Sequence, residues 1–316
     1  MSKVLVAGVN GFVGHHVARQ LYENEHTVIG VGNQPKVSDE LKPIVRTYYG
    51  LDLTSDQEVR NIELNNLDAI INLAGFAKVG DSKGKGELYE KVNVGVHTTL
   101  YKGCLRQGVS PRILAISTGA VYDPHQDLPI TETSALVDDA QTNEYVVSKK
   151  KLEVALQPLK KQGLDIIIAR PFNHSGPGQL PGFLIPDLGE QIKEAAENNT
   201  PLKVGNLTTK RDYTDVRDVA RAYVDLATRD KSNLKHGVYN VCSGKSVAGT
   251  EILELLKKAF NAPGVKTEID ESRIRKNDIM EIYGSRTRIT EDIGWEPMIP
   301  VEKMIDDYAA WKKLNA

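Results

Sequence analysis

Short apolar runs alternate with longer stretches of helical periodicity over the first half of the chain. The apolar runs are continuous, and they cover residues 3–9, 27–32, 68–74, 112–118 and 165–170. Between them, helical periodicity covers residues 13–23, 56–65, 88–107 and 144–162. Continuous apolar runs are typical of strands that helices cover on both faces, and their alternation with helices indicates βαβ units. The pattern predicts an α/β protein with a doubly wound parallel sheet.

The local amino-acid composition changes after Arg170. The segment PFNHSGPGQLPG is crowded with Pro, Gly and Asn, which favour turns and interrupt regular elements. We therefore expect one domain over residues 1–170, with segments near 212–243 returning to its sheet, and a smaller C-terminal region over 171–316. Beyond the turn-rich segment the pattern predicts strands at 202–204 and 238–242, and helices over 183–198, 216–228, 249–260 and 301–313.

Composition narrows the classes of function. With 40% apolar and 26% charged residues, the 316-residue chain has the profile of a packed, water-soluble protein. The formal charge of −2 comes without a basic block, which speaks against a nucleic-acid partner. No apolar stretch approaches the roughly 20 residues of a membrane span, and no cleavable leader precedes the first strand. We expect a cytoplasmic protein with no membrane partner.

The two cysteines and the first histidines carry no chemistry in this pattern. Cys104 and Cys242 fall in a helical and a strand-like stretch, and two separate cysteines in a cytoplasmic chain provide no disulfide framework. We interpret both as buried small side chains. His15 and His16 have no partner ligands at metal spacing, so no metal site is predicted.

The first apolar run leads directly into a glycine-rich turn. GVNGFVG places Gly8, Gly11 and Gly14 between the predicted strand and helix, with Phe12 at the start of that helix. Glycines there let the backbone and the helix N-terminus approach a pyrophosphate, whose charge the helix dipole and free N–H groups stabilise. The context predicts a nicotinamide dinucleotide site in a Rossmann-type domain.

The end of the second predicted strand bears on the choice of cofactor. An acidic residue at this place holds the adenosine ribose 2′-hydroxyl of NAD, but Gly32 occupies it and is followed by Asn33, Gln34 and Lys36. No carboxylate repels a 2′-phosphate, and the Lys36 ammonium can meet it, so the segment favours NADP(H). Asn33 is equally able to hydrogen-bond a ribose hydroxyl, which leaves NAD(H) open.

A third group of residues has the chemistry of proton transfer. Tyr145 and Lys149 are four residues apart in NEYVVSKK and so share one face of the predicted helix. A nearby ammonium stabilises a phenolate and lowers its pKa toward neutrality, and Lys149 can also hold the nicotinamide ribose. Thr118 ends the fourth predicted strand, where open α/β sheets bind ligands, and can hydrogen-bond a substrate carbonyl or alkoxide. We expect Thr118, Tyr145 and Lys149 to be catalytic, with Thr118 and Tyr145 also touching the substrate.

In this order along the chain, these motifs resemble the extended short-chain dehydrogenase/reductase family, which includes nucleotide-sugar epimerases, dehydratases and 4-keto reductases. Further matching segments are LDL at 51–53, NLAG at 72–75 and STGAVY at 117–122. Besides the glycine turn, Asn33 and Lys36, the resemblance implies cofactor contacts from Asp52, Leu53, Leu73, Ala74, Gly75, Asn93, Ser117, Tyr145, Lys149 and Phe172.

The residues after Thr118 separate the activities of this family. Its dehydratases generally carry an acidic residue directly after the strand-end threonine, but here Gly119 and Ala120 follow, and neither can move a proton. The resemblance therefore implies hydride transfer at one carbon and argues against a 4,6-dehydratase. Because 4-epimerases also work with Thr or Ser, Tyr and Lys, reductase and epimerase both stay open.

Segments of the second half are similar to one branch of the family, that of GDP-4-keto-6-deoxy-D-mannose reductase and related GDP-sugar 4-keto reductases. They are RPFNHSGPGQ, VGNLTTKRDYTDVRDVARAY and YNVCSG. By this resemblance Asn173 faces the sugar or diphosphate, and Arg211 and Arg275 bind phosphate oxygens, a task suited to always-charged guanidinium groups. RIRKND at 273–278 departs from the Arg-Pro-x-Glu pattern expected of that branch, which bears on how the region covers the nucleotide.

The resemblance implies NAD(P)H-dependent reduction of the C4 ketone of a GDP-linked 4-keto-6-deoxy sugar, with residues 171–316 as a substrate-binding lid. The alternatives are a 4-epimerase with tightly bound NAD and a non-catalytic nicotinamide-sensing regulator. The presence of Tyr145 and Lys149 speaks against the regulator. The predicted helices at 88–107 and 144–162 resemble those that family members pair into a four-helix bundle, so a homodimer is expected.

Overall fold

A computed structural model describes residues 1–274 and 278–315 of the chain. Within them the largest element is a seven-stranded sheet made of β1 (Lys3–Ala7), β2 (Thr27–Gly32), β3 (Val45–Gly50), β4 (Ala69–Asn72), β5 (Arg112–Ile116), β6 (Ile166–Pro171) and β10 (Val238–Val241). The strand order is β10-β6-β5-β4-β1-β2-β3, and every neighbouring pair is parallel. The predicted doubly wound sheet is confirmed.

Helices cover both faces of the sheet. They are α1 (Phe12–Glu23) and α6 (Val216–Thr228) on one face, and α2 (Asp56–Val59), α3 (Gly86–Gln107) and α4 (Glu144–Lys161) on the other. In β1, Val4 and Val6 belong to the first of these two cores, whereas Leu5 and Ala7 belong to the second. Successive side chains of a strand point to opposite faces, so the continuous apolar runs reflect burial on both sides.

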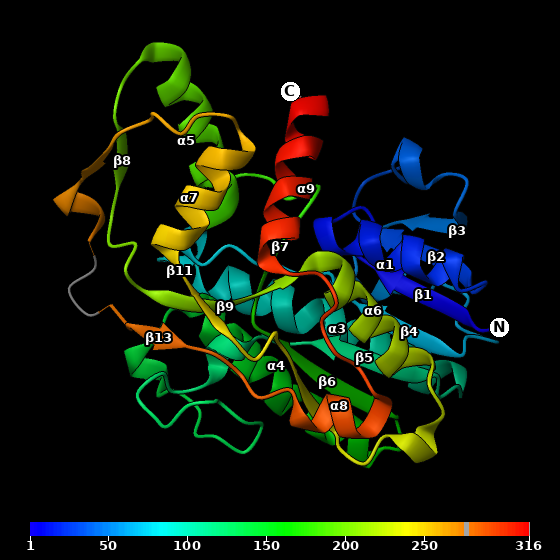
Figure 1. Cartoon of the computed structure of the whole chain (residues 1–316). Helices are drawn as coiled ribbons and strands as arrows, with labels where there is room; N and C mark the ends of the chain where they lie inside the picture. The colour runs from blue at the N-terminus through cyan, green and yellow to red at the C-terminus, as the bar shows by residue number, and fades with distance from the viewer. Residues whose placement is uncertain (275–277, 316) are drawn as a thin grey trace.

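The chain after Arg170 builds a smaller region beside the main sheet, in which α5, α7 and α9 lie together (Figure 1). Its elements are β7 (Asn173–Ser175), α5 (Leu184–Asn198), β8 (Leu202–Val204), β9 (Lys210–Asp215), β11 (Ser246–Ala248), α7 (Gly249–Ala259), β12 (Thr267–Ile269), β13 (Glu281–Ile282) and α9 (Val301–Leu314). Strands β7, β9, β11 and β13 form one small sheet, and β8 pairs with β12. Helix α8 (Thr287–Ile293) packs near β10 of the main sheet.

Two elements of the first half differ from the predictions. The pattern does not predict β3, because this edge strand leaves several of its side chains exposed and so lacks a continuous apolar run. The helix predicted over 56–65 ends at Val59. Beyond it the side chain of Gln107 accepts a hydrogen bond from the Leu64 N–H (3.0 Å) and donates one to the Ile62 carbonyl (2.9 Å), which satisfies backbone groups that a longer helix would have used.

The two cysteines lie where the sequence predicts them, inside the packed protein. Cys104 and Cys242 are buried and carry free thiols, and burial raises the pKa of Cys104 to about 12. Their interpretation as buried small side chains is confirmed.

In the part of the chain that the structure describes, none of the helices combines the length and apolar character that crossing a bilayer requires.

Candidate active site

The turn between β1 and α1 brings the backbone close to the end of a neighbouring strand. Gly8 has a φ of +79°, and a Cβ atom added there would lie 3.0 Å from the backbone nitrogen of Ala74. A Cβ atom at Gly14 would lie 2.2 Å from the Gly8 carbonyl oxygen. Gly11 is the N-cap of α1 and Phe12 its first residue, so the free N–H groups of the helix begin at this turn. The turn fits the pyrophosphate of a dinucleotide, because glycine leaves the backbone and these N–H groups accessible.

The end of β2 is filled by Tyr48 of β3. A Cβ atom at Gly32 would lie 2.9 Å from the Tyr48 phenol oxygen. That oxygen accepts a hydrogen bond from the Asn10 amide (3.3 Å) and donates one to the Gln34 carbonyl (2.8 Å). An acidic side chain at position 32 would therefore require Tyr48 to move.

Two further predicted cofactor residues follow β2. Asn33 and Lys36 are exposed. The Lys36 carbonyl accepts a hydrogen bond at 3.0 Å from the Asn10 amide, which also donates to Tyr48. Asn10 and Tyr48 are not among the residues that the sequence predicts for the cofactor. The position of Asn10 inside the glycine motif is a usable signal, whereas Tyr48 comes from the strand that the pattern misses.

Asp52 and Leu53 follow β3 and lead into α2. Both the backbone N–H and the hydroxyl of Thr54 donate to Asp52 Oδ1, each at 2.8 Å. Leu53 is buried in the core on the α3 side of the sheet. The Asp52 carboxylate is thus already engaged in a local turn, and its contact with the cofactor stays a prediction.

Asn93 of α3 joins the end of β4 to α4. Its side-chain oxygen accepts a hydrogen bond from the Phe76 N–H at 2.7 Å, and its amide donates to the Ser148 hydroxyl at 2.9 Å. A Cβ atom at Gly75 would lie 2.7 Å from the Asn93 oxygen. Asn93 therefore connects the loop that holds residues 73–75 to α4, the helix that carries Tyr145 and Lys149.

The start of α4 places the predicted acid beside the predicted oxygen-binding hydroxyl. The Asn143 side chain accepts a hydrogen bond from the Val146 N–H at 3.1 Å, which caps the helix and puts Tyr145 in its first turn. Exposed fractions of Tyr145 and Lys149 are only 9% and 6%. Thr118 follows β5, and its hydroxyl lies close enough to the Tyr145 phenol to lower the pKa of that phenol. The structure brings these two predicted catalytic hydroxyls into contact.

Burial decides the charge states of Tyr145 and Lys149. It raises the pKa of Tyr145 above the usual value, and the nearby Thr118 hydroxyl opposes this only in part. It also lowers the pKa of Lys149 to about 8, against the negative charge of Glu153. The Lys149 ammonium donates to the Ile116 carbonyl at 2.8 Å. The lowering of the Tyr145 pKa that the sequence predicts is therefore absent in this state, because desolvation outweighs the stabilising groups.

Glu153 of α4 and Arg170 of β6 form a buried ion pair that the sequence motifs do not predict. Ser117, a predicted cofactor residue, donates its hydroxyl to Glu153 at 2.6 Å. The available signal is spacing, since Glu153 follows Lys149 by four residues on the same helix. The partner Arg170 lies on another element and has no local signature.

Phe172 lies beneath the turn that follows Thr118. A Cβ atom at Gly119 would lie 2.8 Å from the Phe172 ring, and one at Gly284 would lie 2.7 Å from it. The exposed fraction of Phe172 is 9%, whereas Ala120 is exposed. Phe172 is thus mainly a packing residue of this turn, and its contact with a cofactor stays a prediction.

The predicted substrate residues lie on the small sheet. Asn173 of β7 is exposed and pairs in register with Tyr213 of β9, and Arg211 lies two positions before Tyr213. One Arg211 nitrogen donates to the Lys210 carbonyl at 2.8 Å. Arg275 lies outside the described residues. Asn173 and Arg211 therefore sit on neighbouring strands, as a shared ligand would require.

The small sheet also touches the glycine turn. The His174 ring stacks on the Phe12 ring with centroids 6.3 Å apart, and His16 Nε2 lies 2.8 Å from the Pro177 carbonyl oxygen. These contacts link the loop after β6 to the first turn of α1. The predicted cofactor and substrate segments thus adjoin one another.

Comparisons with known protein sequences agree with this geometry. The model of the family described as "NAD dependent epimerase/dehydratase family" matches residues 4–242. A GDP-6-deoxy-D-mannose reductase from Pseudomonas aeruginosa is 30% identical over 309 residues, which cover 96% of this chain and 94% of that protein. A UDP-glucose 4-epimerase from Neisseria meningitidis serogroup C is 26% identical over 340 residues, which cover 100% of this chain and 98% of that protein.

Solved structures show the same fold. The structure of RMD from Pseudomonas aeruginosa complexed with NADPH has a TM-score of 0.82 at 28% identity and covers 100% of both chains. That of UDP-glucose 4-epimerase from Thermotoga maritima with UDP-glucose has a TM-score of 0.86 at 23% identity, with 99% of both chains covered. The predicted resemblance is confirmed, and this chain is an enzyme of the NAD-dependent epimerase/dehydratase family, the extended short-chain dehydrogenases/reductases.

Proposed function

We propose that this protein is an NAD(P)H-dependent reductase that converts the C4 ketone of a GDP-linked 4-keto-6-deoxy sugar to an alcohol. The proposal rests on the contact between the Thr118 hydroxyl and the buried Tyr145 phenol, followed at positions 119 and 120 by residues that cannot move a proton. Similarity to a GDP-6-deoxy-D-mannose reductase over almost the whole chain supports both the nucleotide and the reaction.

The proposed proton transfer depends on a neutral Tyr145 and a protonated Lys149, together with the hydroxyl of Thr118. Bound NAD(P)H supplies the hydride for the C4 carbonyl carbon. Thr118 donates a hydrogen bond that orients and polarises the carbonyl oxygen, and Tyr145 gives its proton to this oxygen as negative charge develops there. The raised pKa of Tyr145 keeps the proton on the phenol until the stronger base, an alkoxide, forms. Protonated Lys149 then stabilises the phenolate that is left.

The adenosine end supports NADPH as the preferred cofactor. Gly32 lies against the Tyr48 phenol, so this position holds no carboxylate to repel a 2′-phosphate. The exposed Lys36 ammonium and the amide of Asn33 are the side chains that we propose for the 2′-phosphate and the ribose. A phosphate dianion gains most from such charge-assisted hydrogen bonds.

Residues of the smaller region are proposed to bind the rest of the substrate. Asn173 and Arg211 lie on adjacent strands β7 and β9, and β7 follows the carboxyl end of β6. The guanidinium of Arg211 suits a diphosphate oxygen, and the Asn173 amide suits a sugar hydroxyl.

A nucleotide-sugar 4-epimerase is the second candidate, favoured by similarity to UDP-glucose 4-epimerases along the whole chain. Such an enzyme would use Thr118, Tyr145 and Lys149 with tightly bound NAD and would consume no net cofactor. The position of Gly32 weighs against it, because the acidic residue typical of NAD sites is lacking there. A purely nicotinamide-sensing role is opposed by the contact between Thr118 and Tyr145.

The deciding experiment follows NADPH absorbance at 340 nm during incubation with GDP-, UDP-, dTDP- and CDP-linked 4-keto-6-deoxy sugars. A reductase consumes one NADPH per sugar reduced, fastest with the GDP-linked substrate, and NMR of the product shows a new C4 proton. An epimerase consumes no NADPH with these ketones, because a C4 ketone has no configuration to invert, but it converts a nucleotide-linked 4-hydroxy hexose into its C4 epimer. A sensor binds the cofactor and changes neither compound.

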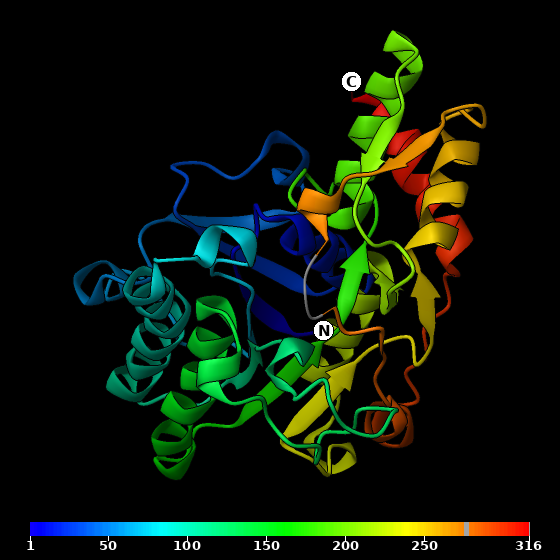
Figure 2. The same ribbon diagram turned by 90° about the vertical axis from the view of Figure 1, so that its left-hand side faces the viewer.

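We also propose that the protein is a homodimer formed through α3 and α4, which lie side by side on the outside of the sheet (Figure 2). Val154 of α4 is 71% exposed on this surface. It lines a shallow groove together with Val94, Ala155 and four charged residues, Glu90, Asp139, Lys150 and Lys151. An apolar strip with a charged rim is suited to pairing with a second copy.

A further inference from the structure

A buried carboxylate lies one helical turn beyond Lys149. Glu153 follows Lys149 by four residues and Tyr145 by eight, so the three share one face of α4. The Glu153 side chain is 11% exposed. Its Oε1 atom accepts hydrogen bonds from the Ser117 hydroxyl (2.6 Å) and from Arg170 Nε (2.9 Å), and its Oε2 atom accepts one from Arg170 Nη2 (2.6 Å).

Stability alone explains this arrangement poorly. Moving two charges out of water costs about as much free energy as their attraction returns. Apolar residues of similar size would therefore often stabilise the core equally well. The place of the pair is more informative than its strength. It joins α4, β5 and β6 at the carboxyl end of the sheet, where Thr118 and Tyr145 meet.

Glu153 fixes the strand end that carries Thr118. Ser117 directly precedes Thr118, and its hydroxyl is bound to Glu153 while its N–H donates to the Ala169 carbonyl at 2.8 Å. The backbone of this strand end is therefore held from the helix and from β6 at once. The distance between the Thr118 and Tyr145 hydroxyls depends on that register.

Glu153 also supplies negative charge near Lys149. The Lys149 ammonium is buried and makes its hydrogen bond to the Ile116 carbonyl, and Glu153 raises its pKa against the effect of burial. Two neighbouring titratable groups have pKa values shifted toward their neutral forms, and the charged Arg170 guanidinium lies against Glu153. Burial and the Lys149 charge hold the pKa of His97, on α3, well below its usual value, and burial raises the pKa of Tyr145.

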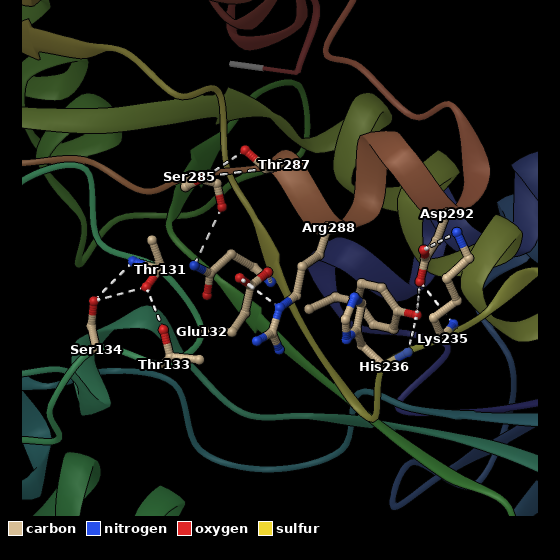
Figure 3. Close-up of polar contacts among 12 residues, drawn as sticks. Thr131, Glu132, Thr133, Ser134, Lys235, His236, Ser285, Thr287, Arg288 and Asp292 are labelled. Carbon is tan, nitrogen blue, oxygen red and sulfur yellow. Dashed lines mark hydrogen bonds and ion pairs between the residues drawn. The ribbon is translucent and has the colours of Figure 1, made fainter.

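The partner of Glu153 is itself held from outside α4. The Arg170 guanidinium lies 4.8 Å from the centre of the Tyr122 ring, and the Tyr122 hydroxyl donates to the Asn240 side chain at 2.7 Å. The Asn240 N–H donates to Glu132 at 2.9 Å, and Glu132 pairs with Arg288 at 3.5 Å (Figure 3). This series of contacts runs from the strand end to the far edge of the sheet, so Arg170 is a fixed anchor.

We propose that Glu153 is a positioning residue of the reaction: its carboxylate holds the strand end that carries Thr118 against the helix face of Tyr145, and its negative charge lies one helical turn from the Lys149 ammonium. The proposal rests on the function proposed above for Tyr145 and Lys149. Glu153 itself touches neither substrate nor cofactor in this scheme.

Glu153→Gln tests the charge while keeping the size of the side chain. We expect the high-pH fall of kcat/KM to move to lower pH by about one unit, since the ammonium loses its stabilising carboxylate. Below that fall, turnover is expected to drop less than in Tyr145→Phe. An unchanged high-pH limb would show that the charge of Glu153 does not act on Lys149.

A second measurement avoids the reaction altogether. The rate at which acetic anhydride labels Lys149 in cofactor-free protein, measured by peptide mass spectrometry across pH, reports the pKa of this ammonium. We expect a midpoint near 8 in the wild type and a lower midpoint in Glu153→Gln. Equal midpoints overturn the proposal, whatever the activity of the protein.

Glu153→Gln leaves Arg170 without its ion-pair partner and could prevent folding. A double variant that removes both charges keeps the test possible in that case. In Glu153→Gln/Arg170→Gln both charges are gone, and the lower labelling midpoint should persist since the opposing charge on Lys149 comes from Glu153. A wild-type midpoint in this variant contradicts the proposal.

Asp165→Asn is the matched control. Asp165 pairs with Arg112 at 3.3 Å at the opposite end of β5 and β6. Its loss should leave both the labelling midpoint and the pH profile unchanged, and a shift equal to that of Glu153→Gln would reduce Glu153 to a structural residue. Full activity of Tyr145→Phe would instead remove the proposed function, while the labelling result for Glu153 would stand by itself.

Discussion

Gly119 lies so close to Phe172 that a Cβ atom added to Gly119 would stand 2.8 Å from the aromatic ring. The first position after the strand-end threonine is therefore closed to any side chain, including the acid that dehydration chemistry would need. The next position, Ala120, is exposed and already carries a Cβ atom. Packing beneath the Thr118 turn thus agrees with chemistry that moves hydride at one carbon.

Gly119→Asp should lower the free energy of unfolding by about 1–3 kcal/mol or more, because the new atoms overlap the Phe172 ring and bury a carboxylate. Chemical denaturation measures this loss. Ala120→Asp is the control and should stay within about 0.5 kcal/mol of the wild type, as expected for an exposed position. Equal stability of both variants would mean that Phe172 moves aside freely.

Tyr145→Phe removes the proton donor and keeps the ring that fills the site. Turnover should fall by a factor of about 10² to 10⁴, the usual contribution of a positioned acid. The dissociation constant of NADPH, measured by fluorescence titration, should change little. Wild-type turnover in this variant would assign proton transfer to another group.

The protonation of Lys149 should limit activity at high pH. Its pKa of about 8 means that the ammonium loses its proton as pH rises through this value, and with it the charge that stabilises the Tyr145 phenolate. We expect kcat/KM to be level below pH 7 and to fall tenfold per unit well above pH 8. A profile that stays flat to pH 10 would separate Lys149 from the reacting step.

Lys36→Ala tests the preference for NADPH. Loss of one charge-assisted hydrogen bond should weaken NADPH binding roughly tenfold and leave NADH binding almost unchanged. Lys42→Ala is a suitable control, because Lys42 is nearby, exposed and paired with Asp39 at 2.5 Å. Equal losses for both cofactors would place the 2′-phosphate away from Lys36.

Val154→Arg tests the proposed homodimer. A charge at the centre of the apolar strip on α3 and α4 should shift the protein toward monomer in sedimentation velocity, since a buried unpaired guanidinium is unfavourable. Tyr22→Arg alters another exposed apolar residue, 55% exposed on α1, and should leave the assembly unchanged. A wild-type protein that is monomeric at all concentrations would contradict the proposal directly.

Local sequence patterns predicted the parts of this protein that depend on near neighbours. Strands such as β1 and β4 are continuous apolar runs because both of their faces are buried. The glycine turn and the spacing of Tyr145 and Lys149 are also local, and each appears where the pattern places it.

Edge and mixed strands were harder to predict. The β3 segment, VRTYYG, carries exposed polar side chains, and the β9 segment, KRDYTD, carries polar side chains that are mostly buried or half-buried. Both become strands through pairing with partners distant in sequence. Missing β3 also hid Tyr48, which fills the space next to Gly32.

The sequence by itself determined the alternation of strands and helices, the glycine turn after the first strand and the helical spacing of Tyr145 and Lys149, because period and spacing act within a few residues. Only the tertiary structure decided that Ser117, Glu153 and Arg170 meet, that Phe172 closes the position of Gly119, and that the pKa of Tyr145 rises. These outcomes depend on burial and on contacts between separate elements, and desolvation is a property of the packed molecule that no local pattern contains.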